Sequence, residues 1–255
     1  MHCHTLIRRF AARSAAAVFT AVAVVAGMQL AITGAQASVT HPPATLNPYS
    51  PAYHRPYRHG VVPTIPRWQK MRQWARGHPG MQAASANDLN YGGGIDGIGV
   101  TTGPAKVYLV FYGSQWGTQG TDGNGDVTLS GDPSGEAPYL QEFLKGLGTG
   151  GELWSGVMTQ YCDGVAAGAQ SCPDGNTQHV AYPTGGALAG VWVDQSAPSP
   201  ATATGNQLGA EAVNAAAHFG NTTATANRDA QYVILSPTGT NPDNWLTGGF
   251  CAWHD

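Results

Sequence analysis

Acidic residues are absent from the first 87 positions of the chain, and basic residues are nearly absent from the rest. All 15 Asp and Glu lie at or after Asp88, whereas nine of the 12 Lys and Arg lie at or before Arg76. The region from Asp88 onward therefore carries 3 − 15 = −12 charges. Because so acidic a domain repels phosphate, the charge distribution argues against a nucleic-acid partner.

Cysteine is also scarce, with four in 255 residues. Cys162 and Cys172 enclose a short segment rich in turn-forming residues, so we predict a disulfide between them. Because Cys3 lies in a segment that we expect to be removed on export, Cys251 is expected to be unpaired within the mature chain. The alternatives are a free buried thiol, a disulfide between two chains, or a partner that this chain lacks. Three cysteines at these spacings are too few and too scattered to predict a zinc site.

Only one long hydrophobic run is present, from about Ala15 to Ile32, preceded by arginines and followed by Ala35-Gln36-Ala37. This order is that of a secretory signal peptide, residues 1–37, with cleavage after Ala37. The alternative is a membrane anchor, because roughly 18 apolar residues can just span a bilayer. We expect cleavage, no transmembrane segment in the remaining chain, and a secreted, extracellular protein.

Residues 38–87 form a Pro-, His- and Arg-rich leader, which we expect to be extended and largely disordered. Only Arg67–Arg76 has the spacing of a short basic helix. The leader carries six positive charges and no negative ones. The favoured interpretation is a soluble spacer, with a pro-segment docked on its own acidic domain or a ligand of an acidic envelope polymer as alternatives.

The globular domain, residues 88–255, is organised around the apolar segment Lys106–Tyr112. Its uninterrupted β-branched and aromatic residues predict a central strand covered on both faces. Further strands are expected at Ala189–Asp194 and Gln231–Ser236. The predicted fold is α/β (or α+β), a layered domain with a mixed, mostly parallel sheet and flanking helices.

Two amphipathic helices are expected to cover this strand. The first, Glu136–Leu147, has an apolar stripe at helical spacing: Tyr139, Leu140, Phe143, Leu144 and Leu147. The second begins at a capping box, Thr204 with Gln207, ends at Gly220, and shares one apolar face: Leu208, Ala212, Ala215 and Phe219.

No motif in the chain predicts a complete catalytic site. Gly-x-Ser-x-Gly, phosphate-loop and His-Glu-x-x-His patterns are all missing. A Ser/His/Asp set, drawing on His179, His218 or His254, remains as an alternative serine hydrolase, but no nucleophile and base stand at recognisable spacing.

One segment has the beginning of a calcium loop, with candidate ligands Asp122, Asn124 and Asp126. Val127 and Pro133 stand where that pattern requires Gly and Glu, so an Asp/Asn/Gly turn is the favoured interpretation.

Two stretches, YGGGIDGIGVTTGPAKVYLVFYGSQW from Tyr91 and AQYVILSPTGTNPDNWLTGGFCAWHD from Ala230, carry a family resemblance. They resemble secreted actinobacterial relatives of the plant phosphate-induced, or exordium-like, extracellular proteins. The resemblance implies the amino-terminal part of a zincin-like, zinc-peptidase-like domain. The cysteines and the His-Glu helix that would bind zinc in complete relatives have no counterpart up to Asp255, so we expect an incomplete domain without catalysis or cofactor of its own.

A second interpretation is a non-catalytic module that binds cell-envelope polymer or polysaccharide. Five tryptophans of the domain are candidate stacking surfaces: Trp116, Trp154, Trp192, Trp245 and Trp253. Because aromatic side chains are usually buried, most of these are expected in the core or as loop anchors.

Overall fold

A computed structural model describes residues 5–6, 47–55, 57–78, 103–169, 171–172 and 178–254. The predicted signal peptide, apart from the strand β1 (Thr5–Leu6), lies outside these residues. So does the glycine-rich segment that precedes the central strand. No helix in the described part of the chain is long and apolar enough to cross a membrane.

The core is a sheet with the order β1-β9-β3-β8. Strand β3 (Lys106–Tyr112) pairs in parallel with β8 (Leu188–Asp194) on one side and with β9 (Ala230–Leu235) on the other. Strand β1 adds an antiparallel edge beside β9. The chain is therefore an α+β protein with a mixed, mostly parallel sheet, as its sequence predicts.

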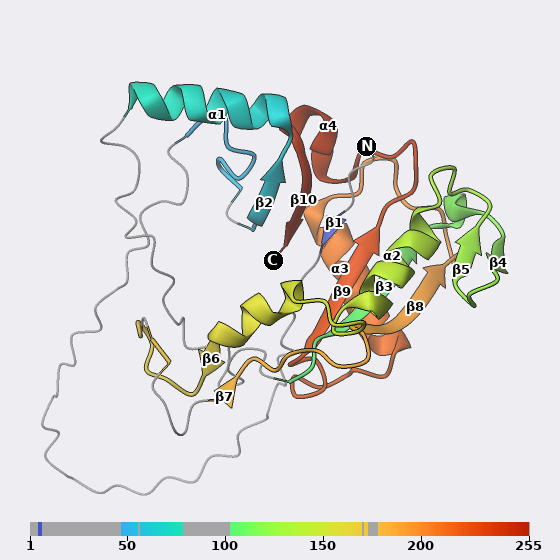
Figure 1. Ribbon diagram of the computed structural model, residues 1–255. Coiled ribbons are helices and arrows are strands. Elements are labelled where there is room, and N and C mark those ends of the chain that lie inside the picture. Colours follow the sequence, from blue (N-terminus) through green and yellow to red (C-terminus); the bar gives the residue numbers. More distant parts are fainter. Residues whose placement is uncertain are drawn as a thin grey trace, which may run out of the picture.

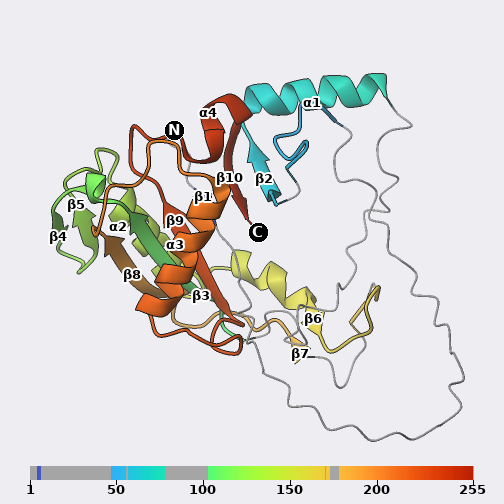
Figure 2. The same cartoon turned by 180° about the vertical axis from the view of Figure 1, so that it is seen from behind.

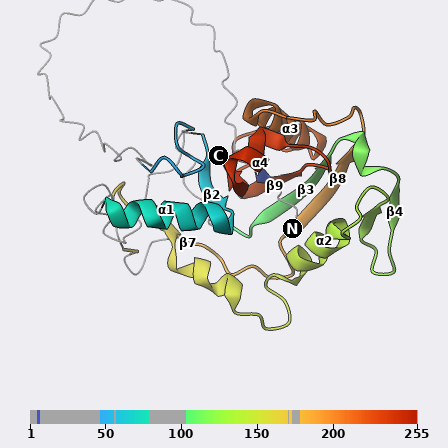
Figure 3. The same cartoon turned by 90° about the horizontal axis from the view of Figure 1, so that it is seen from above.

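The central strand is covered on both faces, which confirms the prediction for Lys106–Tyr112. Leu109, Val110 and Phe111 are fully buried, because successive side chains point to opposite faces and both faces are packed. Figure 3 shows α3 (Gly205–His218) on one side of the sheet and α2 (Glu136–Gly146) on the other. The sheet thus lies between two separate hydrophobic clusters.

Helix α3 follows the predicted pattern. The Thr204 side chain accepts a hydrogen bond from the backbone N–H of Gln207, and the Gln207 side chain accepts one from the backbone N–H of Thr204. Leu208, Ala212 and Ala215 are buried against the sheet. Small residues on this face let the helix approach the strands closely.

Helix α2 is rotated relative to the prediction. Its buried residues are Ala137, Gln141 and Leu144, whereas Tyr139 and Phe143 face solvent. The predicted stripe was therefore wrong at these two positions. The cause is a buried polar residue, since hydrogen bonds to a neighbouring hairpin direct Gln141 inward, and an apolar pattern gives no sign of them.

Shorter elements surround this core (Figures 1 and 2). Strands β4 (Gln119–Thr121) and β5 (Val127–Leu129) form a hairpin beside α2, and β6 (Cys162–Asp163) pairs with β7 (Gln178–His179). The other short elements of the acidic domain are η2 (Ser114–Trp116), η3 (Trp154–Gln160), η4 (Pro242–Asn244), α4 (Trp245–Gly248) and β10 (Phe250–His254).

The leader contributes ordered structure, contrary to the expectation of a largely disordered segment. Strand β2 (His59–Pro63) pairs antiparallel with β10, and α1 (Ile65–Gly77) contains the predicted basic helix (Figure 1). The sequence suggested disorder because of its prolines, yet Pro63 ends a strand and Pro66 lies in the first turn of a helix, where proline is tolerated.

The cysteines behave as predicted in one case only. Cys162 and Cys172 form the expected disulfide, with their Cα atoms 6.0 Å apart. Cys251, however, is disulfide-bonded too, and the described residues include no free cysteine. The expectation of an unpaired Cys251 is thus wrong, because it rested on the pairing of Cys162 with Cys172 and on the assumed removal of Cys3.

Candidate functional site

Three aromatic side chains lie exposed on one surface formed by α2 and η3. Tyr139 is 69% exposed, Phe143 47% and Trp154 70%, and the ring centroids of Phe143 and Trp154 are 6.2 Å apart. We call this group, Tyr139, Phe143 and Trp154, the aromatic platform. Exposed aliphatic side chains accompany Trp154 along η3: Leu153, Val157 and Met158.

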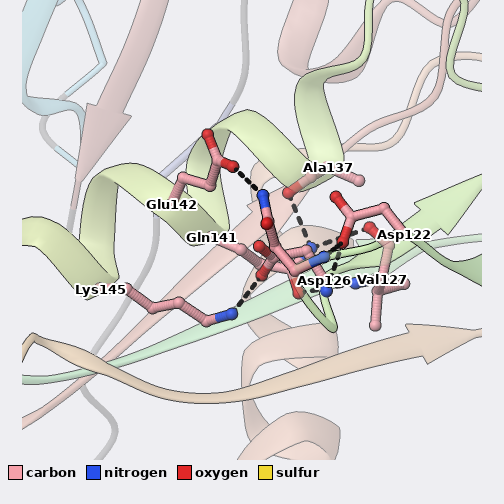
Figure 4. A network of polar contacts seen from close by, with 8 residues as sticks. Asp122, Asp126, Val127, Ala137, Gln141, Glu142 and Lys145 are labelled. Carbon is pink, nitrogen blue, oxygen red and sulfur yellow. Dashed lines mark hydrogen bonds and ion pairs between the residues drawn. The ribbon is translucent and has the colours of Figure 1, made fainter.

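The helix side of the platform is fixed from beneath by Gln141 (Figure 4). Its amide oxygen accepts from the backbone N–H of Val127 at 2.9 Å, and its amide nitrogen donates to the carbonyls of Val127 and Ala137 at 2.9 and 2.8 Å. Gln141 thereby links α2 to the β4–β5 hairpin through hydrogen bonds. Since its face of the helix is held inward, Tyr139 and Phe143 are held outward.

The calcium-loop candidates also belong to this network (Figure 4). Asp122 Oδ1 accepts from the backbone N–H groups of Asn124 and Asp126, each at 2.9 Å, which makes an Asx turn between β4 and β5. Asn124 Nδ2 donates to Glu142 Oε1 at 2.8 Å. The structure therefore brings all three candidates to one hairpin turn.

Asp126 is the buried member of the three. Its Oδ1 is 2.5 Å from Lys145 Nζ on α2, and its side chain is 1% exposed. The ammonium group supplies the countercharge that a buried carboxylate requires. Within the described ranges no group of three or more His, Cys, Asp or Glu side chains is placed to hold a metal ion.

The η3 side of the platform is held by the carboxylate of Glu152. Its oxygens accept from the backbone N–H groups of Gly148 at 2.7 Å and Ser155 at 3.0 Å, and from the Ser155 hydroxyl. The Tyr182 hydroxyl donates to the Glu152 carbonyl. These bonds, with Ser155 first among them, lower the pKa of Glu152 to about 2, so the carboxylate stays charged at any ordinary pH.

The far end of η3 is tied down as well. The Cys162–Cys172 disulfide follows it directly, the backbone N–H of Val180 donates to the Tyr161 carbonyl at 2.9 Å, and His179 Nδ1 is 2.9 Å from the Thr159 carbonyl oxygen. Both supports of the platform are thus fixed to the fold by polar contacts.

Of the five tryptophans singled out in the sequence, Trp154 alone is highly exposed. Trp116 and Trp253 are 2% and 1% exposed and belong to the core. Trp192 and Trp245 are half-buried and pack against the cluster beneath α3. Trp192 also stacks on His218, with ring centroids 4.4 Å apart.

The three candidate histidines lie on three different elements, namely β7, α3 and β10. His179 is beside the Thr159 carbonyl, and His218 stacks on Trp192. His254 is opposite His59 of the leader in the β2–β10 pairing. None of these contacts joins a histidine to a serine and a carboxylate, so the geometry offers no support for the serine hydrolase.

A second polar site, which sequence reasoning missed, lies at the carboxyl ends of the parallel strands. Asp194 ends β8, Tyr112 ends β3, and the two are partners in the strand register. Glu211 of α3 is 3% exposed, and Asp194 is close enough to contribute to the raised pKa of its carboxyl group. The sequence signal for this site is that Tyr112 and Asp194 each end a predicted strand, because the carboxyl ends of parallel strands meet at one sheet edge.

Burial raises the pKa of Glu211 to about 7, and the neighbouring Asp194 adds to the shift. Burial also raises the pKa of Tyr112. Glu211 Oε2 accepts from Asn214 at 3.2 Å, whereas Oε1 has no donor among the described groups. Near neutral pH the buried Glu211 carboxyl group can therefore gain or lose a proton.

These features define the class of protein: an α+β domain with a parallel three-stranded core, an ordered basic leader and a pre-organised aromatic surface. No protein-family model, curated protein or solved structure matches the chain.

Proposed function

We propose that this chain is an exported, extracellular binding module for cell-envelope polysaccharide. The observation that carries the proposal is the aromatic platform, three exposed rings on two elements that polar contacts hold in place. Aromatic rings offer broad apolar faces, and covering such a face is favourable without any large rearrangement of the protein. The C–H face of a sugar ring is a suitable partner for such a surface.

Export is supported by two features. The arginines, apolar run and Ala-x-Ala triplet of residues 1–37 form the pattern of a secretory signal. The Cys162–Cys172 disulfide fits an oxidising compartment, where such bonds persist.

Kinship with the exordium-like extracellular proteins is part of the proposal. It is supported by the two sequence stretches that resemble that family, one around β3 and one from β9 to β10. In this proposal the sheet of β3, β8 and β9 corresponds to the amino-terminal part of a zincin-like domain. No described residue of this chain is assigned a catalytic or metal-binding role.

The test is retention on purified, insoluble cell-wall polysaccharide. Trp154→Ala removes the most exposed ring and should weaken retention about tenfold, which corresponds to about 1.4 kcal/mol. Trp68→Ala is the matched control, because Trp68 is also exposed but lies on α1 of the leader. It should bind as the wild type does.

Equal retention of Trp154→Ala and the wild type would reject the platform as the binding surface. Retention lost with Leu153→Ala but kept with Trp154→Ala would also count against a sugar ligand, because an aliphatic side chain offers no ring on which a sugar can stack.

A further inference from the structure

The described part of the leader lies along β10 and α4 of the acidic domain (Figures 1 and 2). The filled site consists of Asp243, the carbonyls of Thr247, Gly248 and Gly249, and strand β10. Its occupant is the segment from Tyr57 to Arg67, which runs through β2 into the first turn of α1.

Arg58 is the anchor of this segment. Its Nε donates to Asp243 Oδ2 and its Nη2 to the Asp243 carbonyl, both at 2.8 Å. Its Nη1 donates to the Pro51 carbonyl at 2.7 Å, and its guanidinium lies 4.5 Å from the centroid of the Phe250 ring. Arg58 and Asp243 are 7% and 6% exposed, so the ion pair is almost fully buried.

Backbone pairing extends the contact along β10. Ala252 is opposite Val62 and Phe250 is opposite Pro63 in an antiparallel register. Beyond β2, the Thr64 N–H donates to the Gly249 carbonyl at 2.8 Å. Arg67 donates to the carbonyls of Gly248 at 3.1 Å and Thr247 at 3.0 Å. Strand pairing plus side-chain anchors is the general mode of peptide recognition by strand addition.

The domain side of the site is shaped to receive an arginine. Asp243 has a φ of 50°, a left-handed conformation that few residues adopt, and its N–H donates to the Ala203 carbonyl. A Cβ on Gly249 would lie 2.8 Å from Arg67 Nε, and one on Gly248 would lie 2.4 Å from the Phe250 ring. Glycine at these two positions therefore leaves room for the side chains of Arg67 and Phe250.

The leader is also peripheral to the core that it touches. No side chain of α1 is buried, and every buried member of the two hydrophobic clusters lies between Val107 and Trp253. The charges of leader and domain, +6 and −12, are complementary. Tyr57 and Val61 of the leader pack against one cluster, but no described leader residue is a buried member of either cluster.

We propose that the acidic domain carries a binding site for an extended, arginine-bearing peptide, and that the leader occupies it in cis as a releasable pro-segment. Covalent linkage places the leader at an effective concentration of about millimolar, so it excludes competing peptides until the Arg58 anchor is lost. This site is separate from the aromatic platform and does not depend on the proposed function.

The test uses the full chain and a fluorescent synthetic peptide covering Tyr57 to His78. Binding is measured by fluorescence anisotropy to the wild type and to the Arg58→Ala chain. A second peptide carries alanine at position 58, and a third has the same composition in scrambled order. The wild-type peptide should bind the Arg58→Ala chain at least tenfold more tightly than it binds the wild-type chain, and at least tenfold more tightly than either control peptide binds.

Equal binding of the peptide to both chains overturns the proposal, as does a scrambled peptide that binds equally well, since attraction between opposite charges alone would then suffice. If Arg58→Ala does not fold, as judged by near-ultraviolet circular dichroism, Arg58→Lys replaces it. That variant keeps the buried positive charge but loses the forked donor geometry, and the same peptides must then show the same tenfold preference. Absence of binding to a folded variant refutes the site.

Discussion

Replacing Arg58 by alanine should cost this protein a large part of its stability. The pair with Asp243 is almost fully buried, with side-chain exposures of 6% and 7%. Removing one partner of a buried ion pair strands the other charge, and typically costs about 3–5 kcal/mol. After the substitution, Asp243 keeps the Tyr57 hydroxyl as a donor to Oδ1 at 3.1 Å, but Oδ2 loses Arg58.

The assay is equilibrium unfolding in urea followed by tryptophan fluorescence, because buried Trp253 packs against Tyr57 of the leader. Arg55→Ala is the control, since Arg55 is an exposed arginine three residues earlier and surface substitutions change stability by about 0.5 kcal/mol or less. The double variant Arg58→Ala, Asp243→Ala should lose less than the sum of the single losses, because no charge is left stranded. Indistinguishable stabilities of Arg58→Ala and Arg55→Ala, or strictly additive losses, would refute the reasoning.

Two further outcomes are expected. The pKa of Glu211 is raised from 4.5 to about 7, so the folded state binds the proton more tightly than the unfolded state does. The resulting stabilisation is fully present below pH 4.5, and the free energy of unfolding falls by about 3 kcal/mol as the pH rises to 7. Glu211→Gln cannot ionise and should abolish that dependence in urea unfolding between pH 4.5 and 8, whereas an unchanged slope would show that another group is responsible. On α2, buried Leu144→Ala should cost about 2–5 kcal/mol and exposed Phe143→Ala less than about 1 kcal/mol, and the reverse order would favour the originally predicted apolar stripe.

Local sequence patterns correctly predicted those elements in which the residues favoured locally are also the residues that tertiary packing needs. The strand Lys106–Tyr112 is apolar at consecutive positions, and the structure buries both of its faces. The Thr204–Gln207 capping box needs only neighbouring residues, and α3 begins there as expected. The loop between Cys162 and Cys172 is similarly local.

Polar contacts between distant segments account for the differences. The rotation of α2 depends on hydrogen bonds from Gln141 to Val127, 14 residues earlier. The order in the leader depends on Arg58 and Asp243, 185 residues apart. Residues in such contacts follow no hydrophobic periodicity, so the sequence pattern does not indicate which of them pair.

The sequence likewise predicted only part of the aromatic platform. The sequence predicts Trp154 as a candidate stacking residue, but it places Tyr139 and Phe143 in the core because they share an apolar helix face. Spacing shows that residues share a helix face, whereas the neighbours of the helix decide whether that face is inside or outside.

The sequence alone thus determined the central strand, the cap of α3 and the disulfide of Cys162 with Cys172, because each is encoded by residues close together in the chain. Tertiary structure decided the docking of the leader, the orientation of α2 and the burial of Glu211 near Asp194. Each of these arises where charged or polar groups from distant segments are removed from water and must find partners, and only the folded chain brings those partners together.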